Sequence, residues 1–152
     1  MTLTSLVYIE RNNRLLMLHR VKKEKDINRG KWVGIGGKFE KGESPLECAK
    51  REVKEETGWD LLAPHFAGIV TFIYGADAPL YMFVYTGTIA SDEIVENDEG
   101  VMAWIPREKL FDLNLWAGDV KFLEPLLLGQ TPFDIKVVYD EKGRLIESQT
   151  WK

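Results

Sequence analysis

The segment from residue 37 to residue 59, GKFEKGESPLECAKREVKEETGW, constrains the fold and chemistry of this chain more than any other part of it. Residues 44–47, SPLE, place a capping serine, a proline at the first helical position and a glutamate that can reach back to the cap. Gly58 is placed to end the helix. A buried stripe with three- and four-residue steps comprises Leu46, Ala49 and Val53. The segment therefore predicts an amphipathic helix after a glycine-led turn.

The second half of this helix carries Glu52, Glu55 and Glu56. Their i, i+3 and i+4 spacing puts three carboxylates on one helical face, where like charges destabilise an isolated helix unless cations compensate them. A hard divalent ion such as Mg²⁺ or Mn²⁺ suits carboxylate oxygens and also binds phosphate oxygens. The alternative is a solvated acidic face balanced by basic residues of the same helix.

The full segment fits the Nudix box pattern, Gly-x5-Glu-x7-Arg-Glu-U-x-Glu-Glu-x-Gly-U, in which U is apolar. The matching positions are Gly37, Glu43, Arg51, Glu52, Val53, Glu55, Glu56, Gly58 and Trp59. The chain thus resembles the Nudix hydrolases, although Trp59 stands where most members carry an aliphatic residue. The complete box favours the metal site over the solvated acidic face.

Composition and hydrophobic patterning predict one domain spanning residues 1–152, since 45% of the residues are apolar and no linker or repeat interrupts the chain. Asn12 and Asn13 tolerate the positive φ of a tight hairpin turn. The expected strands are 3–9, 15–19, 67–74, 80–89, 101–105, 135–139 and 145–150, and a second helix is expected over 119–128. This α/β pattern agrees with the α/β/α sandwich with a mixed β-sheet, the Nudix fold, that the resemblance implies.

The net charge of −4 and the lack of a basic run argue against binding to a DNA or RNA polymer. No signal-like or membrane-length apolar stretch is present, so we expect no membrane partner and a cytoplasmic location. The single cysteine, Cys48, lies inside the predicted helix and is interpreted as a packing residue. The sequence leaves the oligomeric state open.

Several residues outside the helix extend the predicted site. The glycine-rich turn at residues 34–37 brings backbone groups close to a metal or phosphate, or simply forms a tight turn; with the resemblance, Gly36 becomes the candidate carbonyl ligand. Lys23 and Lys38 are candidate cations for phosphate oxygens, against the alternative that both are only solvated. In similar Nudix enzymes a glutamate about forty residues beyond the box reaches the metal site, and Glu99 matches it here; the alternative is an ordinary acidic loop.

The stretch from Leu115 to Leu128 resembles oxidised-purine nucleoside triphosphate hydrolases of the MutT/MutX type. That resemblance places Trp116 as a stacking platform for the purine and Asp119 as a hydrogen-bond partner of the base edge. A core or lid aromatic is the alternative for Trp116. At two positions this chain departs from the base-binding residues of the mammalian oxidised-purine nucleoside triphosphate hydrolase. That enzyme has a second aspartate where Gly118 stands and an asparagine that contacts the base where Val33 stands.

The expected activity is metal-dependent hydrolysis of a purine nucleoside triphosphate, such as 8-oxo-dGTP, to the monophosphate and pyrophosphate, a nucleotide-pool sanitation reaction. The candidate catalytic residues are Glu52, Glu55, Glu56, Glu99 and Arg51. The candidate ligands of Mg²⁺, or Mn²⁺, are Gly36, Glu52, Glu55, Glu56 and Glu99. The candidate substrate-binding residues are Lys23, Lys38, Trp116 and Asp119. Arg51 is expected to orient the box carboxylates and Glu43, and the identity of the general base stays open.

Alternative activities keep the metal helix and change the substrate. An ADP-ribose hydrolase of this family usually has a proline about sixteen residues past the box, where this chain has Tyr74-Gly75. A dinucleoside polyphosphate hydrolase has a tyrosine near that spacing, which Tyr74 nearly matches. A non-catalytic nucleotide sensor would usually have lost box carboxylates.

Overall fold

The computed structural model of the chain describes residues 1–95, 98 and 100–151. Its strands are β1 (Thr2–Arg11), β2 (Arg14–His19), β3 (Trp32–Val33), β4 (Ile35–Lys38), β5 (Leu62–Tyr74), β6 (Leu80–Thr88), β7 (Val101–Pro106), β8 (Phe133–Tyr139) and β9 (Leu145–Trp151). Its helices are α1 (Pro45–Thr57), the 3₁₀ helix η1 (Arg107–Asp112) and α2 (Asp119–Leu127).

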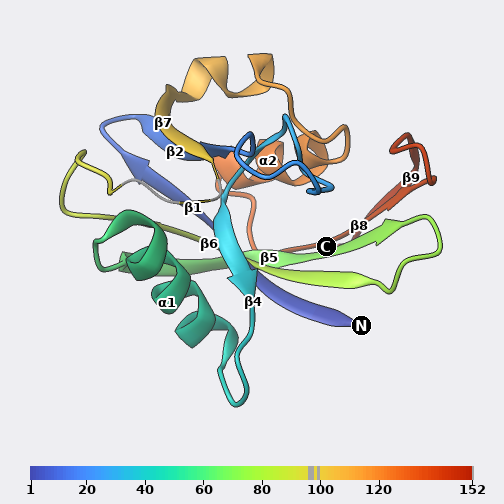
Figure 1. Cartoon of the computed structure of the whole chain (residues 1–152), viewed down its shortest axis with the longest axis horizontal. Helices are drawn as coiled ribbons and strands as arrows, with labels where there is room; N and C mark the ends of the chain where they lie inside the picture. The colour runs from blue at the N-terminus through green and yellow to red at the C-terminus, as the bar shows by residue number, and fades with distance from the viewer. Residues whose placement is uncertain (96–97, 99, 152) are drawn as a thin grey trace.

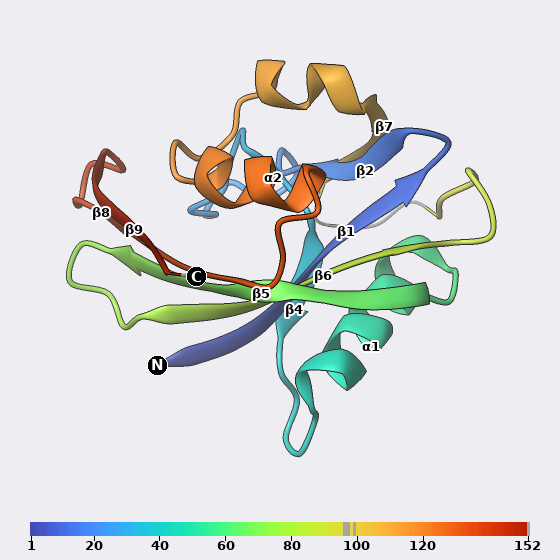
Figure 2. The ribbon, with the colours of Figure 1, turned by 180° about the vertical axis from the view of Figure 1, so that it is seen from behind.

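The strands form one mixed sheet in the order β3-β2-β1-β6-β5-β8-β9, with β4 added to β1 and β7 added to β2. The β1–β6 and β5–β8 pairs are parallel, and the remaining pairs are antiparallel. Helix α1 covers one face of the sheet, and α2 and η1 lie over the other (Figures 1 and 2). This arrangement confirms the predicted α/β/α sandwich.

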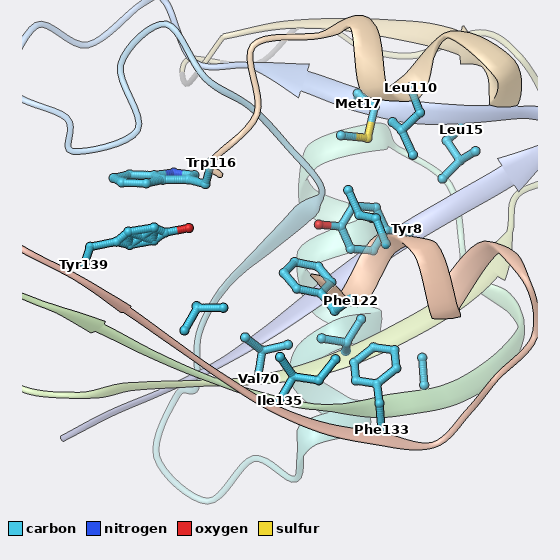
Figure 3. Packing of buried hydrophobic residues seen from close by; sticks show 14 residues of the cluster. Tyr8, Leu15, Met17, Val70, Leu110, Trp116, Phe122, Phe133, Ile135 and Tyr139 are labelled. Atoms are coloured by element: carbon cyan, nitrogen blue, oxygen red, sulfur yellow. The ribbon is translucent and has the colours of Figure 1, made fainter. Parts of the chain in front are cut away.

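Each face of the sheet has its own hydrophobic core. Under α2, Phe122 and Leu123 pack with residues of β1, β2, β5 and β8 (Figure 3). Under α1, Ala49 and Val53 are fully buried against the opposite face. Burial of this apolar surface on both faces is the main favourable contribution to folding, and it holds the two helices in fixed positions.

Strand β1 shares one edge between two partners. Its Thr4–Val7 segment pairs with β4, whereas Ile9–Arg11 pairs with β2. In the first register Gly36 lies opposite Leu6, and a Cβ at Gly36 would collide with the carbonyl oxygen of Ser5. Glycine is therefore required here, and the close approach sets the backbone of β4 beside α1.

Local signals predicted most element boundaries correctly. The capping box is confirmed, because the Glu47 backbone N–H donates to Ser44 Oγ at 3.1 Å and the Ser44 N–H donates to Glu47 Oε1 at 3.0 Å. Gly58 ends α1 with a left-handed φ of 83°. The hairpin turn is confirmed by positive φ values of 53° at Asn12 and 61° at Asn13.

Three features differ from the sequence expectation. Strands β3 and β4 were not predicted, because the glycines at residues 34, 36 and 37 have low strand propensity and the pairing depends on β1 and β2. Strand β5 begins at Leu62 rather than Ala67, and its pairing with β6 is irregular before Gly68. Helix η1 directly follows β7 and was not predicted. None of the helices in the described ranges is long and apolar enough to cross a membrane.

Candidate active site

Arg51 is the centre of the polar network on α1. Its Nε and Nη2 donate to Glu43 Oε2 at 2.7 Å and Oε1 at 3.0 Å, and its Nη1 donates to Glu52 Oε1 at 2.9 Å and Glu55 Oε2 at 3.2 Å. Nη2 also donates to the Lys38 carbonyl at 3.1 Å. The hydrogen bonds from Arg51 lower the pKa of Glu43, and a hydrogen bond from the Glu40 backbone N–H lowers it further. Arg51 therefore joins the box helix to β4 and orients two box carboxylates.

Glu52 lies against the glycine turn. A Cβ at Gly37 would be only 2.5 Å from Glu52 Oε1, so the missing side chain makes room for this carboxylate. The Glu52 side chain is 15% exposed. Together with Gly36, Gly37 and Lys38 it lines a cleft of about 460 Å³ between β4 and α1. The cleft thus combines a carboxylate with backbone that closely approaches it.

The other two box glutamates differ in exposure. Glu56 is 6% exposed, whereas the Glu55 side chain is 57% exposed and bonded to Arg51. Glu52 and Glu56, one helical turn apart, are the two largely buried carboxylates on this face. Glu99 lies outside the described residues, so its predicted role has no geometry here.

The donor set fits a hard divalent ion. Carboxylate oxygens and a backbone carbonyl are the ligands that Mg²⁺ and Mn²⁺ prefer. Within residues 1–95, 98 and 100–151, no three acidic, histidine or cysteine side chains converge as a metal site. Glu52 and Glu56 would therefore need further oxygen ligands, which the Gly36 carbonyl, substrate phosphates and waters can supply.

A second, more apolar cavity of about 180 Å³ opens beside the cleft. Its walls include Trp116 and Asp119, the two residues predicted to bind the base. Gly36, Gly37 and Arg20 line both the cavity and the cleft. The predicted base pocket and the predicted phosphate and metal cleft are therefore adjacent, which the sequence alone could not establish.

Trp116 is held in the cavity wall by specific contacts. It is 6% exposed, and its indole N–H donates to Asn28 Oδ1 at 2.7 Å. Phe72 meets the ring edge-on with centroids 5.4 Å apart, and the Lys31 ammonium lies 5.4 Å from the ring centroid. The ring thus belongs to the core and also lines the cavity, and its stacking on a base stays a prediction.

Asp119 begins α2 and is 7% exposed. Burial raises its pKa to about 7, opposed by a hydrogen bond from the Trp116 backbone and by the charge of Lys31. Near neutral pH this carboxyl group can therefore either accept or donate a hydrogen bond in the cavity.

The two departures from the mammalian pattern have structural consequences. A Cβ at Gly118 would lie 2.6 Å from the Tyr139 hydroxyl and 2.8 Å from Val137 Cγ1, so no second aspartate fits there. Val33 lines the cavity with an apolar surface where an amide would otherwise stand. The cavity consequently has one carboxylate on this turn of the chain.

The candidate cations occupy different places. Lys38 lines the cleft, whereas Lys23 is exposed and is absent from the described walls of both cavities. Arg20, which sequence reasoning missed, lines both cavities and donates from Nε to Asp26 Oδ2 at 2.7 Å. Lys31 was also missed. The loop of residues 20–31 brings Arg20 to the cavity wall and Lys31 to the Trp116 ring, and no local motif indicates this arrangement.

Comparison with known proteins supports the box assignment directly. A family model described as the NUDIX domain matches residues 2–126. The chain belongs to the Nudix family. It is an enzyme of that family, a Nudix hydrolase, and its family relatives include proteins named for nucleoside triphosphate hydrolysis.

Two relatives and one solved structure illustrate the similarity. An uncharacterized Nudix hydrolase of Bacillus subtilis, YvcI, is 33% identical over 111 residues, which cover 67% of this chain and 68% of that protein. An oxidized purine nucleoside triphosphate hydrolase of Danio rerio is 29% identical over 132 residues, covering 86% and 82%. The crystal structure of the MutT protein from Bacillus halodurans superposes with a TM-score of 0.87 at 24% identity, covering 99% and 97%, and shows the common Nudix fold.

Proposed function

We propose that this Nudix hydrolase cleaves a purine nucleoside triphosphate, with 8-oxo-dGTP as the leading candidate, to the monophosphate and pyrophosphate. The observation that carries the proposal is the shared wall of the two cavities, where Gly36, Gly37 and Arg20 face both. A nucleotide with its base beside Trp116 would then direct its phosphates toward Glu52. Similarity to relatives named for oxidized purine nucleoside triphosphate hydrolysis supports this substrate class.

Glu52, Glu56 and the Gly36 carbonyl would hold Mg²⁺ or Mn²⁺, with Glu55 and Glu99 as additional ligands. Such an ion, when bound, neutralises phosphate charge and lowers the pKa of a bound water. Water adds to phosphorus as the bond between the α- and β-phosphates breaks, so one water and one triphosphate give a monophosphate and pyrophosphate. The box carboxylates accept the proton released by that water.

Arg51 acts on this reaction through the carboxylates that it holds. Its hydrogen bonds to Glu52 and Glu55 fix their positions relative to β4, and its pairing with Glu43 fixes Arg51 itself. Lys38 and Arg20 face the cleft and would neutralise phosphate oxygens. This arrangement makes Arg51 a positioning residue and leaves substrate contact to the other two cations.

Base binding would use the cavity beside the cleft. Trp116 supplies an aromatic surface for stacking, which is worth about 1–3 kcal/mol per base. Asp119 supplies a hydrogen-bonding group on the edge of the pocket. Tyr74 nearly matches the tyrosine of a dinucleoside polyphosphate hydrolase. In this structure its hydroxyl donates to the Glu141 carbonyl at 3.2 Å, and its ring packs edge-on against Trp116. It therefore supports the cavity wall.

Substitution of Glu56 by Gln tests the proposal, because the amide keeps the shape of the side chain and removes its charge. We expect Glu56→Gln to lose more than about 100-fold in kcat with Mg²⁺ and to bind Mn²⁺ more weakly by electron paramagnetic resonance. Glu108→Gln, an exposed change on η1, is the matched control. Wild-type turnover of every nucleotide by Glu56→Gln would sink the assignment, and tight nucleotide binding without any hydrolysis by the wild type would indicate a sensor.

A further inference from the structure

The buried phenol of Tyr8 has no role in the reaction proposed above. Tyr8 lies on β1, is 2% exposed, and packs its ring against Phe122 with centroids 6.2 Å apart. The same residue lines the cavity that contains Trp116 and Asp119. No hydrogen bond from its hydroxyl is found among the described residues, and this oxygen is not among the fully buried atoms that lack a partner. A phenol buried to this degree normally has one, so the cavity is where a partner would bind.

The hydroxyl of Tyr8 stays protonated at any physiological pH. Burial, and secondly the negative charge of Asp119, raise its pKa well above the ordinary value. Tyr8 and Asp119 both line this one cavity. One wall therefore presents a hydrogen-bond donor, and a neighbouring wall presents a carboxyl group.

The position of Asp119 is fixed by a second tyrosine. The Tyr139 hydroxyl accepts the Gly118 N–H at 2.7 Å, which anchors the first turn of α2 to β8. In Figure 3 the hydroxyls of Tyr8 and Tyr139 both point toward the space between their rings. Tyr139 therefore holds the turn that carries Asp119, and Tyr8 reaches toward that turn from the sheet.

We propose that Tyr8 and Asp119 together recognise the lactam edge of a purine, an N–H group next to a carbonyl oxygen. The carboxylate accepts from the ring N–H, and the phenol donates to the carbonyl. Guanine, 8-oxoguanine and hypoxanthine present this edge, whereas adenine presents a ring acceptor beside an amino donor. With Asp119 ionised, adenine would place its ring acceptor against the carboxylate, and such an unpaired contact between buried polar groups disfavours a ligand, so the binding experiments are done at a pH above the pKa of Asp119.

This inference rests on the proposed function for its substrate class, so its test measures binding separately from hydrolysis. The ligands are dIMP and dAMP, which differ only at the edge concerned, and isothermal titration calorimetry gives their dissociation constants. Tyr8→Phe removes the donor alone. Tyr85→Phe, which removes a phenol from the core under α1, is the matched control. Circular dichroism and thermal unfolding verify that each variant is folded.

We expect the wild type to bind dIMP more tightly than dAMP, and Tyr8→Phe to reduce that preference by about 3- to 10-fold, the value of one neutral hydrogen bond. Tyr85→Phe should keep the wild-type preference. An unchanged preference in folded Tyr8→Phe, or no preference in the wild type, would overturn the inference. If Tyr8→Phe does not fold, the wild type still provides a test, because O6-methyl-dGMP lacks the lactam and should bind more weakly than dGMP; equal affinities would overturn the inference.

Hydrolysis of the corresponding triphosphates, followed by pyrophosphate release, separates the two proposals. A wild type that hydrolyses none of them but shows the Tyr8-dependent preference would refute the proposed function and support the inference. A wild type that hydrolyses them while Tyr8→Phe keeps the full preference would refute the inference alone.

Discussion

The guanidinium of Arg51 holds the carboxylate of Glu43 through two parallel hydrogen bonds, Nε to Oε2 at 2.7 Å and Nη2 to Oε1 at 3.0 Å. Glu43 precedes helix α1 and Arg51 lies in its middle, so this pair ties the loop before the helix to the helix itself. The Nη1 group of Arg51 donates to Glu52 and Glu55. The geometry of the box thus depends on a planar, forked donor.

Replacement of Arg51 by Lys should test that dependence. A single ammonium cannot hold Glu43 with two bonds and also reach Glu52 and Glu55, so we expect the free energy of unfolding to fall by about 1–3 kcal/mol. We also expect kcat to fall by at least about tenfold with little change in KM, because positioning is lost and substrate contact is kept. Lys54→Arg, on the exposed side of the same helix, is the control. Wild-type kcat in Arg51→Lys would contradict this role.

The same pair predicts how stability depends on acid. The pKa of Glu43 is lowered from its ordinary value of 4.5, so the folded state favours the ionised form. This contribution is complete above pH 4.5 and is lost as the pH falls through the lower, folded-state pKa. Urea unfolding of the wild type and Glu43→Gln between pH 7 and pH 3 should therefore show curves that converge at the acid end. A stability difference that is constant with pH would be inconsistent with this pairing.

Asp119 should make the free energy of unfolding depend on pH with the opposite sign to Glu43. The unfolded chain releases this proton near pH 3.8, but the folded chain retains it until about pH 7. The folded state binds more protons in this window, so the group makes the free energy of unfolding fall as the pH rises through it. Asp119→Asn should remove that decline, whereas Asp112→Asn, an exposed change, should keep it. Identical pH slopes for wild type and Asp119→Asn would show that burial does not shift this carboxyl group.

Gly118 should reject the second aspartate found in the mammalian pattern. A side chain there meets the Tyr139 hydroxyl and Val137, so we expect Gly118→Asp to lower the free energy of unfolding by at least about 1–3 kcal/mol, as overpacked cores do. Ala117→Asp adds the same charge to the neighbouring exposed position and should cost much less. Denaturant unfolding of both variants measures the difference. Equal stability of Gly118→Asp and the wild type would show that this turn can move aside.

Local sequence signals predicted the parts of the fold that depend on neighbouring residues. Ser44 and Glu47 form the expected capping box, and Gly58 ends the helix where a left-handed residue was expected. The i and i+4 positions of Glu52 and Glu56 were likewise readable from spacing. Such features depend on a few consecutive residues, which is why the box helix could be placed without a structure.

Features built by distant pairing could not be predicted in the same way. Strand β4 consists largely of glycine and is defined by its register with β1. Tyr8 on β1 and Arg20 at the start of the loop that follows β2 line the cavity together with Asp119, which is far from them in the sequence, so no local pattern indicates this arrangement. The sequence therefore indicated the chemistry of the helix, while the cavity walls needed the tertiary structure.

The most direct test of the central claim, that the box helix and the neighbouring cavity together hydrolyse a purine nucleoside triphosphate, is a ranking of substrates by kcat/KM. The wild-type protein with Mg²⁺ would be assayed against 8-oxo-dGTP, dGTP, 2-hydroxy-dATP and ADP-ribose, with products identified by chromatography. We predict that a purine triphosphate, led by 8-oxo-dGTP, has the highest kcat/KM and yields the monophosphate and pyrophosphate. A clear lead for ADP-ribose, or release of a single phosphate from the triphosphates, would contradict the account.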